Sequence, residues 1–298
     1  MTKKRFVNAQ LKPVLAKLEI ATRKTTSPSG IVGKYQSFYK GAGLEFEGFR
    51  EYTPADDATK IDWKASLRSN EILIKEFAQT RNLLVYMLID ASDSMISGTT
   101  EKLKNEYAAE VSAFLAYNIL INDDNLGYAL YNDEIKEHKL PKRGAKQFYN
   151  LSKSLLNPDI YGGKPNLKTA LNFVMTFLQR GSVLIVISDF LHMQKDDFQN
   201  LKIASSKYDV IAFIIRDPVD YKLPIGMEVL LEDPITKQRQ IIDTSVIAKD
   251  YEVVSKKMFE DLKNNFLKNN IDFIELRTDK PFNYEIRKFF QMRQKKWK

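Results

Sequence analysis

The feature that most constrains the fold of this chain is an alternation, beyond Arg81, of short apolar runs with longer amphipathic stretches. The runs at 83–89 and 183–187 consist of apolar and aromatic residues alone. Such runs are typical of strands buried on both faces, whereas the amphipathic stretches have the spacing of helices. Strands that alternate with helices build a parallel sheet covered by helices on both sides. The sequence therefore predicts an α/β, Rossmann-like fold with a mostly parallel sheet.

The elements of this sheet and its covering helices can be placed from the same pattern. The predicted strands are 83–89, 126–131, 135–140, 183–187, 210–215 and 271–276. The predicted helices are 101–121, 145–156, 167–179, 195–206, 246–268 and a last one from 282. Two extended runs on either side of Asp233-Pro234 predict a β-hairpin, inserted at about 226–244.

The chain ahead of Arg81 has a different pattern. Residues 9–22 carry apolar side chains at helical spacing, which predicts an amphipathic helix. From Gly41 to Phe77, short aromatic and β-branched pieces are broken by Gly, Pro and Asp, so we expect turns and short strands rather than helices. The predicted parts are an N-terminal helix and β-rich segment (1–80), the α/β domain (81–280), and a C-terminal helix with a solvated basic tail (281–298).

Composition limits the chemistry that the chain can perform. Its 298 residues include no cysteine and two histidines, which excludes disulfides, thiolate nucleophiles and cysteine zinc sites. No apolar run approaches the roughly 20 residues of a spanning helix, and a signal peptide's apolar block is missing. We therefore expect a cytoplasmic protein without a membrane span. The formal net charge of +8 comes from scattered Lys and Arg, and does not by itself indicate nucleic acid.

Two of the predicted strands end in an aspartate. Asp90 follows the first strand and opens the sequence Asp90-Ala-Ser92-Asp-Ser94, and Asp189 follows the strand at 183–187. If the strand order is the common 3-2-1-4-5-6, the first and fourth strands are neighbours where the order reverses, and ligands collect at that point. The two aspartates would then face one crevice.

The Asp-x-Ser-x-Ser spacing can turn one carboxylate and two hydroxyls toward a single point. Hard oxygen ligands with an open position suit Mg²⁺, and also Mn²⁺ or Ca²⁺. We therefore expect a divalent metal site formed by Asp90, Ser92, Ser94 and Asp189. An open position on the metal could accept a carboxylate from a partner protein.

These residues resemble the metal-ion-dependent adhesion site (MIDAS) of von Willebrand factor A domains. With the segments Gly43-Leu-Glu-Phe-Glu-Gly-Phe-Arg-Glu-Tyr52 and Lys60-Ile-Asp-Trp-Lys-Ala-Ser-Leu-Arg68, the chain is similar to domain-of-unknown-function family fifty-eight. In that family, the protein with the A-type domain is often encoded beside MoxR-type AAA+ ATPases. The resemblance implies a von Willebrand factor A-like domain that acts as a non-catalytic protein-interaction module. It also implies an adaptor for a MoxR-type ATPase in the assembly or maturation of a client complex.

Two further segments bear on this resemblance, the loop at 162–169 and the residues 61–63. A-type sites usually take a threonine from a Gly-Gly-x-Thr-like loop, and here Gly162-Gly-Lys-Pro-Asn166-Leu-Lys-Thr169 places Pro165 or Asn166 at that position. The resemblance thus makes the side-chain oxygen of Asn166 the fifth candidate ligand, with Thr169 inside a helix. In Ile61-Asp62-Trp63, we expect the Trp and Asp to provide packing and a buried hydrogen bond.

An enzyme would need a nucleophile or an acid–base pair, and the sequence lacks the usual motifs. A phosphate-binding loop ending in Lys-Ser/Thr and a Gly-x-Ser-x-Gly motif are both missing. The alternative to a binding module is a metal-dependent nuclease or phosphoesterase, in which Asp90, Asp93 and Asp189 hold a metal against a phosphodiester. Two hydroxyls among the metal ligands favour the binding module.

Overall fold

The computed structural model describes residues 40–296, except for positions 55, 70, 81, 225, 227 and 233–238. The amphipathic helix expected at 9–22 lies outside these residues. The described chain contains two compact units, one within Tyr35–Leu83 and one within Leu84–Lys298. Among the described residues, no helix is both long and apolar enough to cross a membrane.

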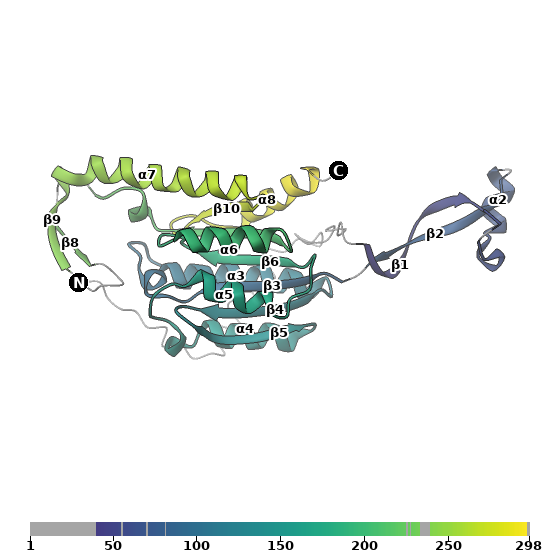
Figure 1. Ribbon diagram of the computed structural model, residues 1–298, viewed down its shortest axis with the longest axis horizontal. Coiled ribbons are helices and arrows are strands. Elements are labelled where there is room, and N and C mark those ends of the chain that lie inside the picture. Colours follow the sequence, from purple (N-terminus) through teal and green to yellow (C-terminus); the bar gives the residue numbers. More distant parts are fainter. Residues whose placement is uncertain are drawn as a thin grey trace. The chain divides into compact units, whose positions relative to one another are not determined.

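The larger unit is built on a six-stranded sheet in the order β10-β7-β6-β3-β4-β5 (Figure 1). Its strands are β3 (Leu84–Asp90), β4 (Asn125–Tyr131), β5 (Ile135–Lys142), β6 (Val183–Ser188), β7 (Asp209–Arg216) and β10 (Asp272–Arg277). Every pairing is parallel except that of β4 with the edge strand β5. Counted along the chain, this is the order 3-2-1-4-5-6, so the predicted mostly parallel sheet is confirmed.

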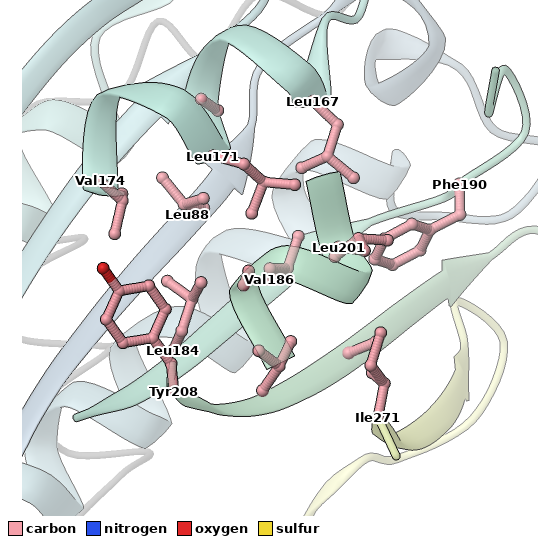
Figure 2. Close-up of a cluster of buried hydrophobic side chains, with 14 of the residues drawn as sticks. Leu88, Leu167, Leu171, Val174, Leu184, Val186, Phe190, Leu201, Tyr208 and Ile271 are labelled. Atoms are coloured by element: carbon pink, nitrogen blue, oxygen red, sulfur yellow. The ribbon is translucent and has the colours of Figure 1, made fainter. Parts of the chain in front are cut away.

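Helices cover both faces of this sheet. They are α3 (Lys104–Ile121), α4 (Ala145–Leu155), α5 (Leu167–Met175), α6 (Lys195–Ser205), α7 (Thr244–Lys268) and α8 (Asn283–Lys296). One face packs against α5, α6 and α7 in an apolar core that includes Phe266 of α7. Figure 2 shows Leu88 and Val186 of the sheet in this core. On the other face, the Tyr128 hydroxyl meets Ser154 of α4, and Phe213 packs against Phe289 of α8. Burial on both faces explains why β3 and β6 consist of apolar residues up to their last positions.

A β-hairpin separates β7 from α7, as the sequence predicts. It consists of β8 (Glu228–Glu232) and β9 (Arg239–Asp243), which pair antiparallel. Its last residue, Asp243, begins α7, because the Asp243 carboxylate accepts a hydrogen bond from the Ser245 N–H at 2.9 Å.

The end of the chain differs from the expected solvated tail at Arg293. This side chain is buried, and its guanidinium forms ion pairs with Asp209 at 2.6 Å and Asp272 at 2.7 Å. Arg293 therefore ties α8 to the amino-terminal ends of β7 and β10. The expectation was wrong at this position because a basic residue in the last turns of a helix looks the same in sequence whether it faces solvent or a pair of carboxylates.

The smaller unit pairs β1 (Lys40–Glu51) with β2 (Leu73–Thr80) antiparallel, and contains a short helix, α2 (Trp63–Ser69). The expectation of turns and strands without helices is therefore wrong at 63–69. The Asp62 carboxylate begins this helix, since it accepts hydrogen bonds from the Lys64 and Ala65 N–H groups, both at 3.0 Å. Trp63 is 64% exposed, so the expected packing role of this side chain is wrong. Asp62 forms hydrogen bonds as expected, but it is half-buried, so the expected burial of these bonds is wrong.

The aromatic core under α7 generates a prediction for stability. Phe266 is fully buried and contacts Phe190 and Phe273 at ring-centroid distances of 5.3 and 5.9 Å. We expect Phe266→Ala to lower the free energy of unfolding by about 3–5 kcal/mol, because it leaves a cavity in a closely packed core. Its neighbour Leu267 is 63% exposed, and Leu267→Ala serves as the control. Urea unfolding of both variants tests the packing, and equal losses would contradict it.

Candidate functional site

The two strand-end aspartates lie at the same edge of the sheet. β3 and β6 are parallel neighbours with Ile89 beside Ile187, so Asp90 and Asp189 both leave the sheet at its carboxyl edge. The Ser188 hydroxyl, between the two strands' ends, donates a hydrogen bond to Asp90 Oδ2 at 2.6 Å. Both aspartates are 1% exposed. The predicted meeting of these two residues is therefore confirmed by the strand order.

The loop after β3 brings both serines to the same place. The Ser92 N–H donates to Asp90 Oδ1 at 2.9 Å, and the Ser92 and Ser94 hydroxyl oxygens lie 3.2 Å apart. A short 3-10 helix, η2 (Asp93–Ile96), forms this turn. A hydrogen bond ties this turn to the loop before α5, because the Asp93 N–H donates to the Gly163 carbonyl at 2.9 Å. Ser92 and Ser94 are as fully buried as the aspartates.

Asn166, the fifth candidate ligand, begins helix α5. Its side-chain oxygen accepts a hydrogen bond from the Thr169 N–H at 3.1 Å, which is the usual role of an N-cap asparagine. Its own N–H donates to the Asn132 carbonyl at 2.9 Å. Thr169 lies inside α5, as expected. The oxygen that Asn166 would offer to a metal is thus engaged with the helix that follows it.

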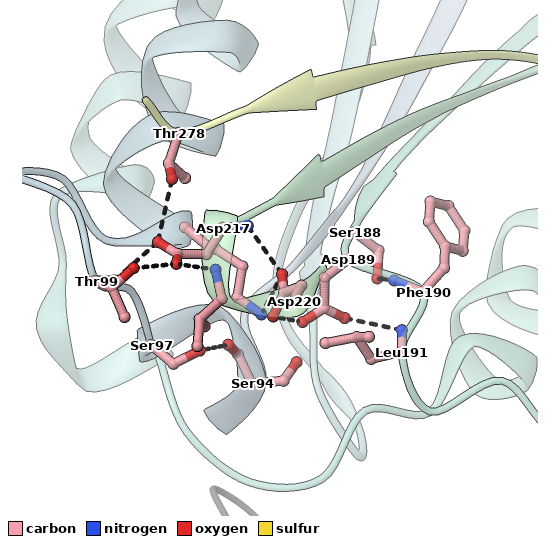
Figure 3. Close-up of polar contacts among 12 residues, drawn as sticks. Ser94, Ser97, Thr99, Ser188, Asp189, Phe190, Leu191, Asp217, Asp220 and Thr278 are labelled. Carbon is pink, nitrogen blue, oxygen red and sulfur yellow. Dashed lines mark hydrogen bonds and ion pairs between the residues drawn. The ribbon is translucent and has the colours of Figure 1, made fainter. Parts of the chain in front are cut away.

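A residue that the sequence reasoning missed, Lys104, lies at the centre of the site. Its ammonium donates a hydrogen bond to Asp189 Oδ2 at 2.7 Å and lies 3.6 Å from Asp220 Oδ2. The side chain is 1% exposed. Asp189 Oδ1 accepts a second hydrogen bond, from the Leu191 N–H at 3.1 Å (Figure 3). A sequence signal did exist, because Lys104 precedes Tyr107, Ala108 and Val111 at the spacing of one helix face.

A second group of carboxylates surrounds Lys104. The 3-10 helix η4 (Pro218–Asp220) follows β7, and Asp220 accepts a hydrogen bond from the Asp217 N–H at 2.8 Å. Asp217 is fully buried and accepts from the Thr99 N–H at 2.8 Å and from the Thr278 hydroxyl at 3.1 Å (Figure 3). Arg216 is buried beside this group. The cluster therefore joins the loops after β3, β6 and β7 to the start of α3.

The electrostatics of the cluster follow from burial and from the lysine. Burial, and then the charge of Asp189, raises the pKa of Asp90 above its ordinary value. Burial also acts to raise the pKa of Asp189, but the Lys104 ammonium outweighs it, so the pKa of Asp189 is lowered. For Lys104, burial is outweighed by Asp189 and Asp220, and the pKa is raised. Asp189 and Lys104 therefore form a charged pair at neutral pH.

In this arrangement, the residues do not fit a resident divalent ion with an open coordination position. Both Asp90 oxygens accept hydrogen bonds from the protein, and one Asp189 oxygen is bound to Lys104. Asn166 is engaged as a helix cap. Mg²⁺ keeps several waters in its octahedral shell, but four of the five side chains expected to hold it are at most 1% exposed. A partner's carboxylate would have to enter this buried cluster to reach a metal.

Comparison with known proteins places this chain in a family. It belongs to the family described as "Protein of unknown function DUF58", which it matches over residues 48–258. It is 21% identical over 266 residues to "Uncharacterized protein Rv1480" of Mycobacterium tuberculosis and "Uncharacterized protein Mb1516" of Mycobacterium bovis. Each match covers 88% of this chain and 84% of the relative.

Two solved structures are similar to this chain over most of its length. A conserved hypothetical protein, BatB from Bacteroides thetaiotaomicron, is 16% identical with a TM-score of 0.46, over 72% of this chain and 100% of BatB. The SpRpn10 VWA domain is 11% identical with a TM-score of 0.41, over 71% of this chain and 95% of that domain. The sheet described above, in the order 3-2-1-4-5-6 with one antiparallel edge strand, has the Rossmann-like α/β topology that the sequence predicts.

The buried carboxylate of Asp217 generates a second prediction. Its oxygens accept hydrogen bonds from Thr99, Val219 and Thr278, so every partner is a donor. We expect Asp217→Asn to lower the free energy of unfolding by about 1–3 kcal/mol, because the amide nitrogen would face a donor.

Asp196→Asn is the matched control, because Asp196 pairs with Lys168 and is 60% exposed. We expect its effect on the free energy of unfolding to be smaller than that of Asp217→Asn, because solvent screens the exposed ion pair. Thermal and urea unfolding measure both variants. An Asp217→Asn chain as stable as the Asp196→Asn chain would mean that the hydrogen bonds do not hold the cluster.

Proposed function

We propose that this member of the DUF58 family is a non-catalytic protein-interaction module that serves as an adaptor for a MoxR-type AAA+ ATPase acting on a client complex. The observation that carries the non-catalytic part is the completeness of the polar cluster. Asp90 and Asp189 are hydrogen-bonded and buried, and Asp189 is ion-paired with Lys104. A catalytic acid or nucleophile has to reach its substrate, and these groups cannot do so.

The docking face that we propose is the rim of loops above the cluster. In open α/β sheets, ligands bind outside the carboxyl ends of the strands, where the order reverses. Exposed residues there include Asp133 and Glu134 after β4, Gly163 and Lys164 before α5, and His192 after β6. Backbone hydrogen bonds hold these loops, for example from Asn132 N–H to the Glu134 carbonyl at 3.0 Å and from Gly162 N–H to the Ala91 carbonyl at 2.8 Å. Partner binding would therefore require little ordering of the loops.

The partner assignment rests on the family resemblance, and it is tested with purified proteins. We expect the full chain to bind the MoxR-type ATPase of its own genome in biolayer interferometry. Asp133→Lys, which reverses a charge on the rim, should weaken this binding about tenfold or more. Asp250→Lys makes the same change on an exposed position of α7 and should leave the affinity unchanged.

The adaptor role and the rim as the docking face can be contradicted separately. A wild-type chain that does not bind the ATPase at all would contradict the adaptor role. Binding that Asp133→Lys and Asp250→Lys affect equally would contradict the rim as the docking face, while the adaptor role would stand.

A nuclease or phosphoesterase is the alternative, and it gives a separate prediction. It requires Asp90, Asp93 and Asp189 to hold a metal next to a phosphodiester, whereas the Asp90 and Asp189 side chains lie beneath the surface. We expect no cleavage of single- or double-stranded DNA or RNA by the purified chain with Mg²⁺ or Mn²⁺. Metal-dependent cleavage that disappears in Asp90→Ala would establish the alternative instead.

A further inference from the structure

We infer that Lys104 is the resident cation of this adhesion-type site, and that its ammonium makes the site independent of divalent metal. The inference concerns the position at which the MIDAS resemblance implies a metal ion. It rests on the contacts of the buried cluster and does not depend on the proposed docking role.

The cluster needs positive charge because the fold forces carboxylates together. Asp90 and Asp189 leave neighbouring parallel strands, and Asp217 and Asp220 come from the loop after the next strand, β7. Buried carboxylates that share a site repel each other unless a cation compensates them or one of them is protonated. Two buried cations of the described residues lie at this cluster, Lys104 and Arg216. Of these two, Lys104 donates a hydrogen bond to Asp189 itself.

Helix α3 delivers the ammonium and holds it. Lys104 is the first residue of α3, and its N–H donates to the Ser97 carbonyl at 3.0 Å. The helix is buried along most of its length and packs against β3, β4 and β7. Lys104 therefore cannot swing to solvent as a surface lysine does, because its backbone belongs to the packed core.

The remaining oxygens have protein partners. Asp90 accepts from Ser92 and Ser188, Asp189 Oδ1 accepts from Leu191, and the Ser92 and Ser94 hydroxyls lie 3.2 Å apart. A divalent ion would have to displace the ammonium from Asp189 Oδ2 and also bring water into a closed cluster. Occupation by Lys104 and by a divalent ion are therefore mutually exclusive.

Removing the ammonium should convert the site into one that responds to metal. In Lys104→Met, the aliphatic part of the side chain keeps most of its packing, while Asp189 and Asp220 lose their shared cation. We expect this variant to melt several degrees lower than wild type in EDTA, and to regain part of the loss in Mn²⁺. Lys102→Met is the matched control, since the Lys102 ammonium pairs with Glu110 at the surface.

The experiment uses the full chain with Mn²⁺ as the probe. Electron paramagnetic resonance counts bound Mn²⁺, and scanning fluorimetry gives the melting temperature in EDTA, Mg²⁺ and Mn²⁺. For wild type and Lys102→Met, we expect no Mn²⁺ binding below about 1 mM and melting temperatures equal within about 1 °C in all three solutions. For Lys104→Met, we expect one bound Mn²⁺, which is lost again when Asp90→Ala is added.

Each result decides the inference. One Mn²⁺ bound by wild type below about 1 mM, and abolished by Asp90→Ala, would overturn it. A folded Lys104→Met chain that binds no Mn²⁺ would show that a divalent ion cannot take the place of the Lys104 ammonium, and would overturn the inference. If Lys104→Met does not fold, the wild-type titration still decides. The double variant Lys104→Met, Asp189→Asn, which removes one charge of each sign, should then fold without binding Mn²⁺.

Discussion

The parallel pairing of β3 with β6 is the constraint on which the rest of this site depends. It places the carboxyl ends of two buried strands side by side, where Asp90 ends β3 and Asp189 directly follows β6. Two carboxylates in a buried crevice repel each other, and without a nearby cation burial would raise the pKa of both. The fold therefore needs a cation at this point, and the start of α3 supplies one in Lys104.

The same charge pair links elements that are distant in the chain. Lys104 connects α3 to Asp189 after β6 and to Asp220 after β7, while Asp217 receives hydrogen bonds from Thr99 and from Thr278 after β10. At the carboxyl edge of the sheet, buried polar groups thus continue the apolar core. The Asp90, Asp189 and Asp217 carboxylates accept hydrogen bonds within this buried cluster, which is why the docking face that we propose is formed by the loops above it.

Much of this arrangement could be predicted from the sequence, because it depends on local patterns. Runs such as 183–187 and helical spacing located the sheet and its helices, and the strand-end positions of Asp90 and Asp189 predicted their meeting. Helix α2 was missed because a single capping residue, Asp62, begins it within a stretch rich in turn formers. Arg293 was misjudged because its partners, Asp209 and Asp272, are distant in the chain.

The sequence by itself determined the order of the elements and the acidic strand ends, since both follow from the periodicity of neighbouring residues. Only the tertiary structure decided what neutralises those ends. A motif states which oxygens are available, but the contacts of those oxygens depend on which helix packs over them. In this chain that helix begins with a lysine, and its ammonium reaches Asp189 at 2.7 Å because α3 is packed against the sheet. The helical spacing around Lys104 indicates on which face of the helix it lies, but nothing in the residues around either position indicates that its partner is Asp189.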